Sequence, residues 1–402
     1  MRRTSKLSGL LLALILALVA AGCGGDGDSA AEGDTDGEGG GGEPIVLGGI
    51  FDLTGPTGDV GTPYAEGARA YFANLAESGG IDGREVTLSS QDYQYDVAVA
   101  EQHYAQYKGE GAVAILGWGT ADTEALVGQV TADELPYFSG SLSEELADPA
   151  ETPYNFLVGT TYSDQMRIAL AHIAEDSPGA NVAVFHNDSP FGESPLADGE
   201  AYIDEAGLDI ASYETYAMPG GATDYVGELS QARGQDVTHI VIQNVASPAA
   251  QLVSNIASQG LDVQVTCLNW CTDELFIELA GDAAEGVWGV TPWFTANLAE
   301  AEEGISAYLE SEGQEIEDLN AHFLQGWYYA DLMTTAIAEV VDSGDEVTGP
   351  ALKAALEGLD TYETGSSPDI DFSEDSHKGM TVAPVLEVSG GEWTQLVEPL
   401  EP

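Results

Sequence analysis

Residues 45–50, Ile-Val-Leu-Gly-Gly-Ile, begin the alternation of strand and helix that decides the fold. Residues 64–76 follow with apolar side chains at helical spacing and end at a Gly-Gly pair, and residues 85–89 are strand-like again. Further strands are predicted at 113–116, 136–138, 156–158, 182–185, 210–213, 239–242, 263–268 and 286–290, and helices at 98–107, 123–130, 196–206, 225–232, 252–258, 275–279 and 320–341. Strands separated by helices are typical of parallel sheets that are covered on both faces. The alternation breaks near residues 159–163 and then resumes, which predicts two doubly wound α/β lobes and a hairpin-like tail at 382–396.

The beginning of the chain has the pattern of an export signal. Three basic residues precede an apolar run at residues 7–21, and Cys23 follows closely. A basic segment of this kind stays on the cytoplasmic side while the apolar run engages the membrane. Because the run is shorter than the about 20 apolar residues of a spanning helix, we expect cleavage rather than a permanent membrane span. An ordinary signal peptide with an incidental cysteine is the alternative.

The end of this signal resembles the lipobox of bacterial lipoproteins. Val19-Ala20-Ala21-Gly22-Cys23 has the small residues and the cysteine of that motif, with Ala20 where the motif most often has Leu. The resemblance implies a signal peptide at residues 1–22, a diacylglycerol on the Cys23 thiol, and a protein anchored by lipid to the outer face of the cell membrane. Residues 23–44 contain mainly Gly, Asp and Glu, so they cannot bury enough apolar surface to fold alone, and we expect a flexible tether.

The charge of the chain is very one-sided. Among 402 residues, 69 are Asp or Glu and 10 are Lys or Arg, which gives a formal net charge of −59 at pH 7. Such a surface repels nucleic acids and anionic lipids, so neither is an expected partner. Concentrated salt shortens the Debye length to about 3 Å and screens this repulsion, so we expect a protein adapted to a salty medium. Roughly 355 residues remain after the signal and the tether, which is too many for one core and suits two lobes.

Cys267 and Cys271 are the only cysteines beyond Cys23. Outside the cell, two cysteines at this spacing favour a small disulfide over a redox pair. Two free buried thiols are the second interpretation. A metal site ranks last, because two further ligands are missing and no histidine lies nearby in the sequence.

Polar and aromatic side chains follow the predicted strands at their carboxyl ends. In parallel sheets, ligands bind beyond these ends and near the N-termini of the following helices. The segments concerned are 51–56, 117–122, 139–143, 186–188, 243–244 and 269–270. Their hydroxyls, amides and aromatic rings suit the binding of a small polar molecule. Because the sequence has no hydrolase elbow and no histidines at metal-ligand spacing, we expect a binding protein without cofactor or metal, rather than an enzyme.

Four motifs then occur in order along the body of the chain. They are Asp52-Leu53-Thr54-Gly55-Pro56, Gly79-Gly80-Ile81-Asp82-Gly83-Arg84, Asp188-x-x-Phe191-Gly192 and Ala280-Gly281-Asp282-Ala283-Ala284-Glu285-Gly286. Together they resemble the type 1 periplasmic binding proteins, in the branched-chain amino-acid-binding (Leu/Ile/Val-binding) family of ABC transporter solute-binding lipoproteins. The resemblance implies two lobes joined by a three-segment hinge. Lobe 1 would comprise residues 45–160 plus about 292–377, and lobe 2 residues 161–291 plus about 378–398.

The function implied by the resemblance is the capture of a small polar solute outside the cell. The two lobes would close on a branched-chain or other amino acid, or on a related amide or carboxylic acid. The partners implied are the permease and ATPase complex of an ABC importer, to which a monomer would deliver the solute. A ligand-sensing receptor domain of the same fold is the alternative from another functional class.

The resemblance also assigns ligand-binding positions. In the family, hydroxyls and backbone N–H groups after the third strand hold the ligand carboxylate, and the next strand end adds a second patch. The residues predicted to bind the ligand are Trp118, Gly119, Thr120, Ala121, Ser141, Ser143, Tyr162, Asn187, Asn244, Asn269 and Trp270. Helix capping is the alternative role for the hydroxyls of Thr120 and Ser143, and core packing is the alternative for the two tryptophans.

Asn269 departs from the family pattern. In the amino-acid-binding members, an acidic residue at this place pairs with the ligand ammonium. A buried ammonium without a carboxylate partner carries a desolvation penalty of roughly several kcal/mol. Either Asp122, Asp188 or Asp273 substitutes from nearby, or the ligand is not an α-amino acid. The two flanking tryptophans would then suit an aromatic acid or a planar amide.

Overall fold

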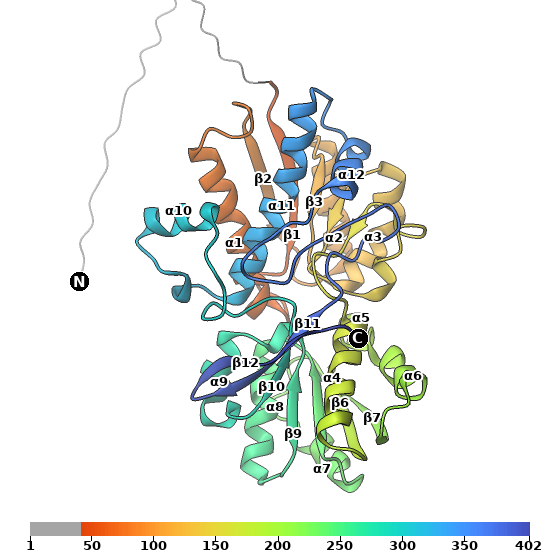
Figure 1. Cartoon of the computed structure of the whole chain (residues 1–402). Coiled ribbons are helices and arrows are strands. Elements are labelled where there is room, and N and C mark those ends of the chain that lie inside the picture. The colour runs from red at the N-terminus through yellow and green to blue at the C-terminus, as the bar shows by residue number, and fades with distance from the viewer. Residues whose placement is uncertain (1–41) are drawn as a thin grey trace, which may run out of the picture. The chain divides into compact units, whose positions relative to one another are not determined.

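Two β-sheets with helices packed against them make up residues 42–402, the part of the chain that the computed structural model describes (Figure 1). The predicted signal at 1–22, the predicted lipidation site Cys23 and all of the predicted tether except residues 42–44 lie outside the described residues. Among the helices between residues 42 and 402, none has the length and apolarity of a membrane span.

The first sheet has five parallel strands in the order β2-β1-β3-β4-β5. Its strands are β1 (Ile45–Phe51), β2 (Val86–Asp92), β3 (Ala114–Leu116), β4 (Tyr137–Phe138) and β5 (Asn155–Phe156), and the helices between them are α1 (Gly58–Glu77), α2 (Val97–Gly109), α3 (Thr120–Asp133) and the short η1 (Glu144–Leu146). The register pairs Leu47 with Leu88 on one side and with Ala114 on the other. Since all five strands are parallel, their carboxyl ends meet at one edge of the sheet.

The second sheet has seven strands in the order β12-β11-β10-β9-β8-β6-β7. Its strands are β6 (Ala180–Asn187), β7 (Ile210–Met218), β8 (His239–Gln243), β9 (Gln264–Cys267), β10 (Trp288–Val290), β11 (Ala383–Ser389) and β12 (Glu392–Leu400). Its helices are α4 (Tyr162–Asp176), α5 (Pro190–Glu193), α6 (Leu196–Ala206), α7 (Val226–Gly234), α8 (Ala246–Gln259), η2 (Asn269–Cys271), α9 (Glu274–Ala280) and η3 (Gly281–Ala284). Strands β6 to β10 are parallel, whereas β11 and β12 form an antiparallel hairpin against β10, which confirms the predicted tail.

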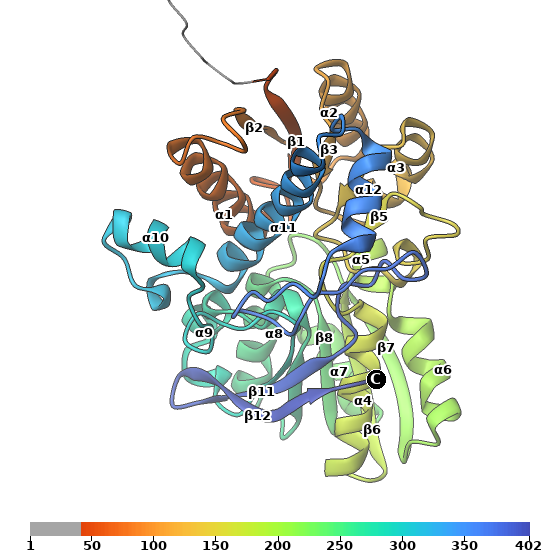
Figure 2. The ribbon, with the colours of Figure 1, turned by 45° about the horizontal axis from the view of Figure 1, so that its top comes forward.

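The longest helix returns to the first sheet. The chain between β10 and β11 forms α10 (Glu303–Glu312), η4 (Ile316–Asp318), α11 (Ala321–Ser343) and α12 (Gly349–Gly358). Helix α11 packs along α1, as both ribbon views show (Figures 1 and 2). A Cβ atom at Gly67 of α1 would lie 2.0 Å from the Phe323 carbonyl oxygen, and one at Gly326 of α11 would lie 1.9 Å from the Tyr64 carbonyl oxygen. The two glycines therefore allow the backbones of the two helices to approach closely.

Side-chain caps fix where several helices begin. Asp96 accepts hydrogen bonds from two backbone N–H groups of α2, and Thr161 and Asn320 each accept one at the start of α4 and α11. These bonds satisfy N–H groups that have no partner inside the helix. Helices α8 and α11 end at Gly260 and Gly344, both of which adopt the left-handed conformation that favours glycine.

Three segments connect the elements of one sheet with those of the other, after β5, after β10 and before β11. They are hydrogen-bonded to one another. The Thr160 hydroxyl donates to the Val382 carbonyl (2.5 Å), and the Trp293 indole donates to the Val158 carbonyl (3.2 Å). This agrees with the predicted fold class, two parallel α/β sheets with a three-segment connection, which is confirmed. The lobe boundaries given above stay a prediction.

Candidate functional site

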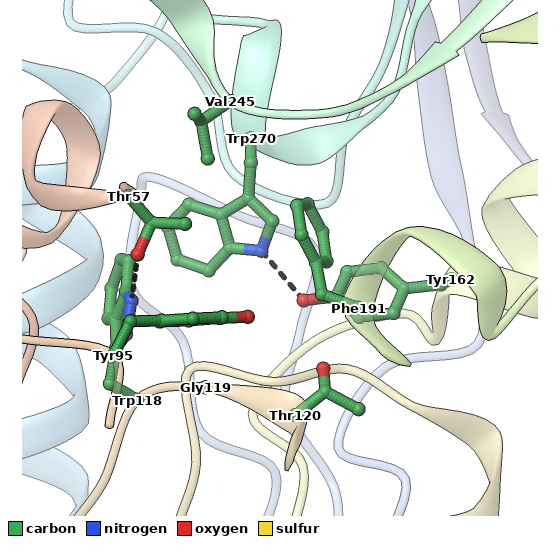
Figure 3. Close-up of a pocket in the computed structure, with 9 residues that line it drawn as sticks. All are labelled: Thr57, Tyr95, Trp118, Gly119, Thr120, Tyr162, Phe191, Val245 and Trp270. Atoms are coloured by element: carbon green, nitrogen blue, oxygen red, sulfur yellow. Dashed lines mark hydrogen bonds between the residues drawn. The ribbon is translucent and has the colours of Figure 1, made fainter. Parts of the chain in front are cut away.

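A small cavity opens between residues of both sheets, with about 20 Å³ of space open to water (Figure 3). Its lining residues are Thr57, Tyr95, Trp118, Gly119, Thr120, Tyr162, Phe191, Val245 and Trp270. The first five follow strands β1, β2 and β3 of the first sheet, and the others lie on α4 or follow β6, β8 and β9 of the second. Carboxyl ends of parallel strands are the usual place for ligands in such folds.

The turn after β1 holds one wall of the cavity. The buried Asp52 carboxylate accepts hydrogen bonds from the Gly55 N–H (2.7 Å), the Thr57 N–H (2.9 Å) and the Thr57 hydroxyl (2.7 Å). The Thr57 hydroxyl oxygen in turn accepts a bond from the Trp118 indole N–H (2.8 Å, Figure 3). Asp52 therefore fixes the Trp118 ring through Thr57.

The N-terminus of α3 forms the floor. Gly119 precedes the helix, and Thr120 is its first residue. The hydroxyls of Thr120 and Ser141 share a hydrogen bond (2.6 Å), which directs the Thr120 hydroxyl toward the cavity in Figure 3. A Cβ atom at Gly119 would lie 2.3 Å from Asp122 Oδ1, so no larger residue fits there. The free N–H groups at the start of a 14-residue helix attract the negative end of a ligand.

Aromatic side chains of the two sheets meet across the cavity. The rings of Trp118 and Trp270 contact edge to face, with their centroids 4.7 Å apart. The Trp270 indole N–H donates to the Tyr162 hydroxyl (2.8 Å), and the Tyr162 ring packs against Phe191 at 5.4 Å. Pairs of this geometry contribute beyond the burial of their surface. The cavity is thus mainly aromatic, with a few hydroxyls.

None of the nine lining side chains carries a charge. The nearest buried carboxyl group along α3 is Asp122, which is 1% exposed and accepts a hydrogen bond from the Tyr93 hydroxyl (2.7 Å). Its second oxygen, Oδ2, has no hydrogen-bond partner among the described residues. Burial raises the pKa of Asp122 to about 7. Burial also raises the pKa of Tyr95 and Tyr162 far above the ordinary range, so their phenols are neutral donors.

Two groups of polar contacts join elements of the two sheets outside the cavity. The Asp59 carboxylate on α1 accepts a hydrogen bond from the Ser247 N–H in the first turn of α8 (2.9 Å). The Lys378 ammonium contacts both Glu144 of η1 (2.5 Å) and Asp164 of α4 (3.0 Å). These contacts therefore tie elements of one sheet to elements of the other.

The structure brings only part of the predicted site to the cavity. Five predicted residues line it: Trp118, Gly119, Thr120, Tyr162 and Trp270. The others are not lining residues: Ala121, Ser141, Ser143, Asn187, Asn244 and Asn269. The Ser141 hydroxyl shares a hydrogen bond with that of Thr120 and lies close to the Tyr162 hydroxyl. The Ser143 hydroxyl accepts a bond from Ser194 (3.1 Å), and the Asn187 amide donates to Asn244 (3.0 Å).

Asn269 is only partly bonded within the protein, because its buried Nδ2 has no hydrogen-bond partner among the described residues. Its N–H donates to the Gln165 side chain (3.0 Å), and its Oδ1 accepts from the Thr291 hydroxyl (2.9 Å). It therefore orients the segment that carries Trp270 rather than lining the cavity. Of the other two acids considered as substitutes, neither Asp188 nor Asp273 lines the cavity.

Four lining residues were missed from the sequence: Thr57, Tyr95, Phe191 and Val245. Thr57 and Val245 each lie one residue beyond a segment predicted to follow a strand at the ligand-binding edge, 51–56 and 243–244. Phe191 belongs to one of the four family motifs, which could have found it. Tyr95 had no such signal, because strand β2 runs to Asp92, three residues beyond its predicted end.

The predicted disulfide between Cys267 and Cys271 is not formed in this structure. Cys267 and Cys271 are free thiols, and both are buried. The Cys271 thiol donates to the Ile242 carbonyl of the neighbouring strand β8 (3.5 Å), and it also lies close to the Cys267 thiol. Burial, together with the neighbouring Cys271 thiol, raises the pKa of Cys267, so it is a poor nucleophile. The structure therefore has two free buried thiols, which was the second interpretation of the sequence. Within residues 42–402 no group of three or more His, Cys, Asp or Glu side chains is placed to hold a metal ion.

Comparison with known proteins identifies the family. Residues 44–392 match the family model described as periplasmic binding protein. The chain belongs to this family. It is a family of solute-binding proteins, which agrees with the expectation of binding rather than catalysis. The order of motifs noted in the sequence is therefore explained by common descent over nearly the whole described chain.

Curated relatives are distant. Leu/Ile/Val-binding protein homolog 7 of Brucella melitensis is 24% identical over 337 residues, which cover 79% of this chain and 81% of the relative. Leu/Ile/Val-binding protein homolog 1 of Brucella abortus is 22% identical over 246 residues, or 60% of this chain. The chain spans 65% of the length of that relative.

Solved structures are similar over a larger part of the chain. One is a branched-chain amino acid ABC transporter protein from Thermus thermophilus with bound valine, with 26% identity, a TM-score of 0.83, and coverage of 89% of this chain and 97% of that chain. Another is an ABC transporter substrate-binding protein from Aeropyrum pernix, with 26% identity, a TM-score of 0.80, and coverage of 90% and 97%.

Proposed function

We propose that this protein is the extracytoplasmic solute-binding component of an ABC importer. It captures a small carboxylate-bearing solute, of the size of a branched-chain amino acid, between its two sheets. The observation that carries the proposal is the cavity itself, since its walls come from the carboxyl ends of strands in both sheets. The structural neighbour from Thermus thermophilus, which has bound valine, supports the size of the solute.

The chemistry of the cavity supports the way the solute would bind. Its carboxylate would meet the N-terminus of α3 and the hydroxyls of Thr120 and Tyr162. Its apolar part would pack against the rings of Trp118 and Trp270, which contact each other in this structure. The space open to water in the cavity is about 20 Å³, far below the roughly 300–1,000 Å³ of pockets for drug-sized ligands, so the sheets would have to separate to admit even a small solute.

The proposed membrane anchoring and delivery to the importer rest on the sequence of residues 1–44. Lipid on Cys23 would hold the protein at the outer face of the cell membrane, and residues 23–44 would give it reach toward the permease and ATPase complex of the importer. The protein would act as a monomer. Closure would move lobe 1 (45–160 plus about 292–377) against lobe 2 (161–291 plus about 378–398) about the three connecting segments.

A matched ligand panel tests the proposal. Calorimetric titration with leucine, valine, 4-methylpentanoate and 3-methylbutanoate compares two amino acids with the same carboxylic acids lacking the amino group. Saturable binding of either member of a pair, with a smaller radius of gyration in small-angle scattering, is the expected result. The difference within a pair shows whether the ammonium is recognised in the absence of a charged lining residue. No binding across the panel, or binding without any change in scattering, would contradict the proposed function.

A further inference from the structure

The turn that carries Tyr95 has an unfavourable backbone. Between β2 and α2, Gln94 has a φ angle of 56° and Tyr95 a φ angle of 59°. They are the only adjacent pair of non-glycine residues with positive φ within residues 42–402. Neither residue is a type that visits the left-handed region readily, as Gly, Asn and Asp do. Two consecutive residues in this conformation persist only where the surroundings impose it, and such strain is found mainly at functional sites.

Hydrogen bonds on both sides impose the conformation. Asp92 Oδ1 accepts bonds from the N–H groups of Leu53 (3.0 Å) and Gln94 (3.0 Å), and Asp92 Oδ2 accepts a bond from the Thr54 hydroxyl (2.5 Å). The turn is therefore joined to the segment after β1. On the other side, the Asp96 N–H donates to the Tyr93 carbonyl (2.9 Å), and the Asp96 side chain caps α2.

The segment after β1 also presses on the turn from one side. A Cβ atom at Gly55 would lie 2.7 Å from the Gln94 carbonyl carbon. The backbones of Gly55 and Gln94 therefore approach closely, which leaves the turn little room to shift on that side. Since both ends and one side of the turn are fixed, the direction of the Tyr95 side chain is fixed with them.

This direction is into the cavity. Figure 3 shows the Tyr95 ring reaching from the first sheet into the space among Trp118, Trp270 and Tyr162, with its hydroxyl toward that of Tyr162. Burial is the main reason why the pKa of Tyr95 is raised, and the nearby Ser189 hydroxyl, which lies after β6 of the second sheet, opposes the rise. The ring thus extends from one sheet to the edge of the other.

We propose that Tyr95 is a specificity-determining residue, whose ring sets the largest apolar group that a bound solute can carry. The inference rests on the proposed function and deepens it. An unstrained turn would leave the phenol free to move aside for larger solutes. The strained turn, pinned by Asp92, keeps the ring as a fixed wall of a cavity that is already small.

The test compares the preference between a small and a large solute. Tyr95→Ala removes the wall, Tyr95→Phe keeps it without the hydroxyl, and Tyr216→Ala is the matched control, because Tyr216 is also half-buried but lies on β7 outside the cavity. The probes are valine and phenylalanine, each also without its amino group as 3-methylbutanoate and 3-phenylpropanoate. Titration calorimetry gives the ratio of the two affinities for each protein.

We expect Tyr95→Ala to raise the affinity for the phenyl probe relative to the isopropyl probe by about tenfold or more, as changes of pocket size do. Tyr95→Phe and Tyr216→Ala should keep the wild-type ratio. Weaker binding of both probes by Tyr95→Ala at an unchanged ratio overturns the inference and leaves the proposed function intact. An equal change of ratio in Tyr216→Ala also overturns it. Wild-type protein that binds none of the four probes overturns both the inference and the proposed function.

Discussion

Asp122 beside the cavity floor makes a quantitative prediction for stability against pH. Its side chain is buried, and burial raises its pKa from the ordinary 3.8 to about 7 in the folded protein. Between these two values the unfolded chain loses the proton and the folded protein keeps it. The folded state therefore binds more protons, and stability falls as the pH rises through this window. Below about pH 4 Asp122 is protonated in both states, so it does not change the free energy of unfolding.

The magnitude follows from the gap between the two pKa values. At 1.36 kcal/mol for each pH unit, the gap corresponds to roughly 4 kcal/mol of free energy of unfolding, lost between about pH 4 and pH 7. Asp122→Asn cannot ionise and should lack this loss. The variant places an amide N–H₂ where Oδ2 has no partner among the described residues, which costs about 1–3 kcal/mol at every pH. The change with pH, rather than the offset, is the predicted quantity.

The assay is urea unfolding of the wild type and of Asp122→Asn at a series of pH values from 4 to 8, at constant high salt. The difference in free energy of unfolding should move by roughly 4 kcal/mol in favour of the variant between the two ends. Glu274 and Asp331, whose pKa values are also raised by burial, are present in both proteins and cancel. A difference that is flat from pH 4 to pH 8 would refute the reasoning.

Three further predictions concern the floor, the connection between the sheets and the charge. Thr120→Ala should weaken binding of 3-methylbutanoate about tenfold in calorimetry, with little change in thermal midpoint, because a hydroxyl bonded to a carboxylate is lost; unchanged affinity removes Thr120 from the site. Lys378→Met should lower the free energy of unfolding in urea by about 1–3 kcal/mol, since Asp164 is buried and loses a partner, whereas the exposed Lys108→Met should cost at most about 1 kcal/mol; equal effects would contradict the argument. With a net charge of −59, the thermal midpoint should rise steadily from low to molar KCl in scanning calorimetry, and a midpoint independent of salt would exclude adaptation to salt.

The sequence predicted the sheets well because buried parallel strands are short apolar runs. Strand β8 is buried at every position, and its limits differ from the prediction by one residue. Helix α4 was not predicted, because its buried side chains include polar ones. Polar residues such as Asp164 and Gln165 are buried in it, where they bond to Lys378 and to the Asn269 backbone, so the apolar spacing of a surface helix is disturbed.

The candidate site was less predictable, because it depends on contacts between distant segments. The end of β2 is polar, from Ser89 to Asp92, as suits an edge strand, and this concealed the turn that carries Tyr95. Asn269 was the reverse case. Its position after a strand was predicted correctly, but the sequence could not show that Gln165 bonds to its backbone N–H and Thr291 to its Oδ1.

The bond between Asp59 and the Ser247 N–H has a consequence for observing motion. Amide groups in the first turn of a helix lack a partner within the helix, and Ser247 is an exposed residue. Asp59, which lies on α1 beside the first sheet, is therefore what shields this amide from exchange with water. Deuterium uptake at Ser247 would consequently follow the separation of α1 from α8. A single amide of the native, unlabelled protein would then report how often the site opens for the solute to enter or leave.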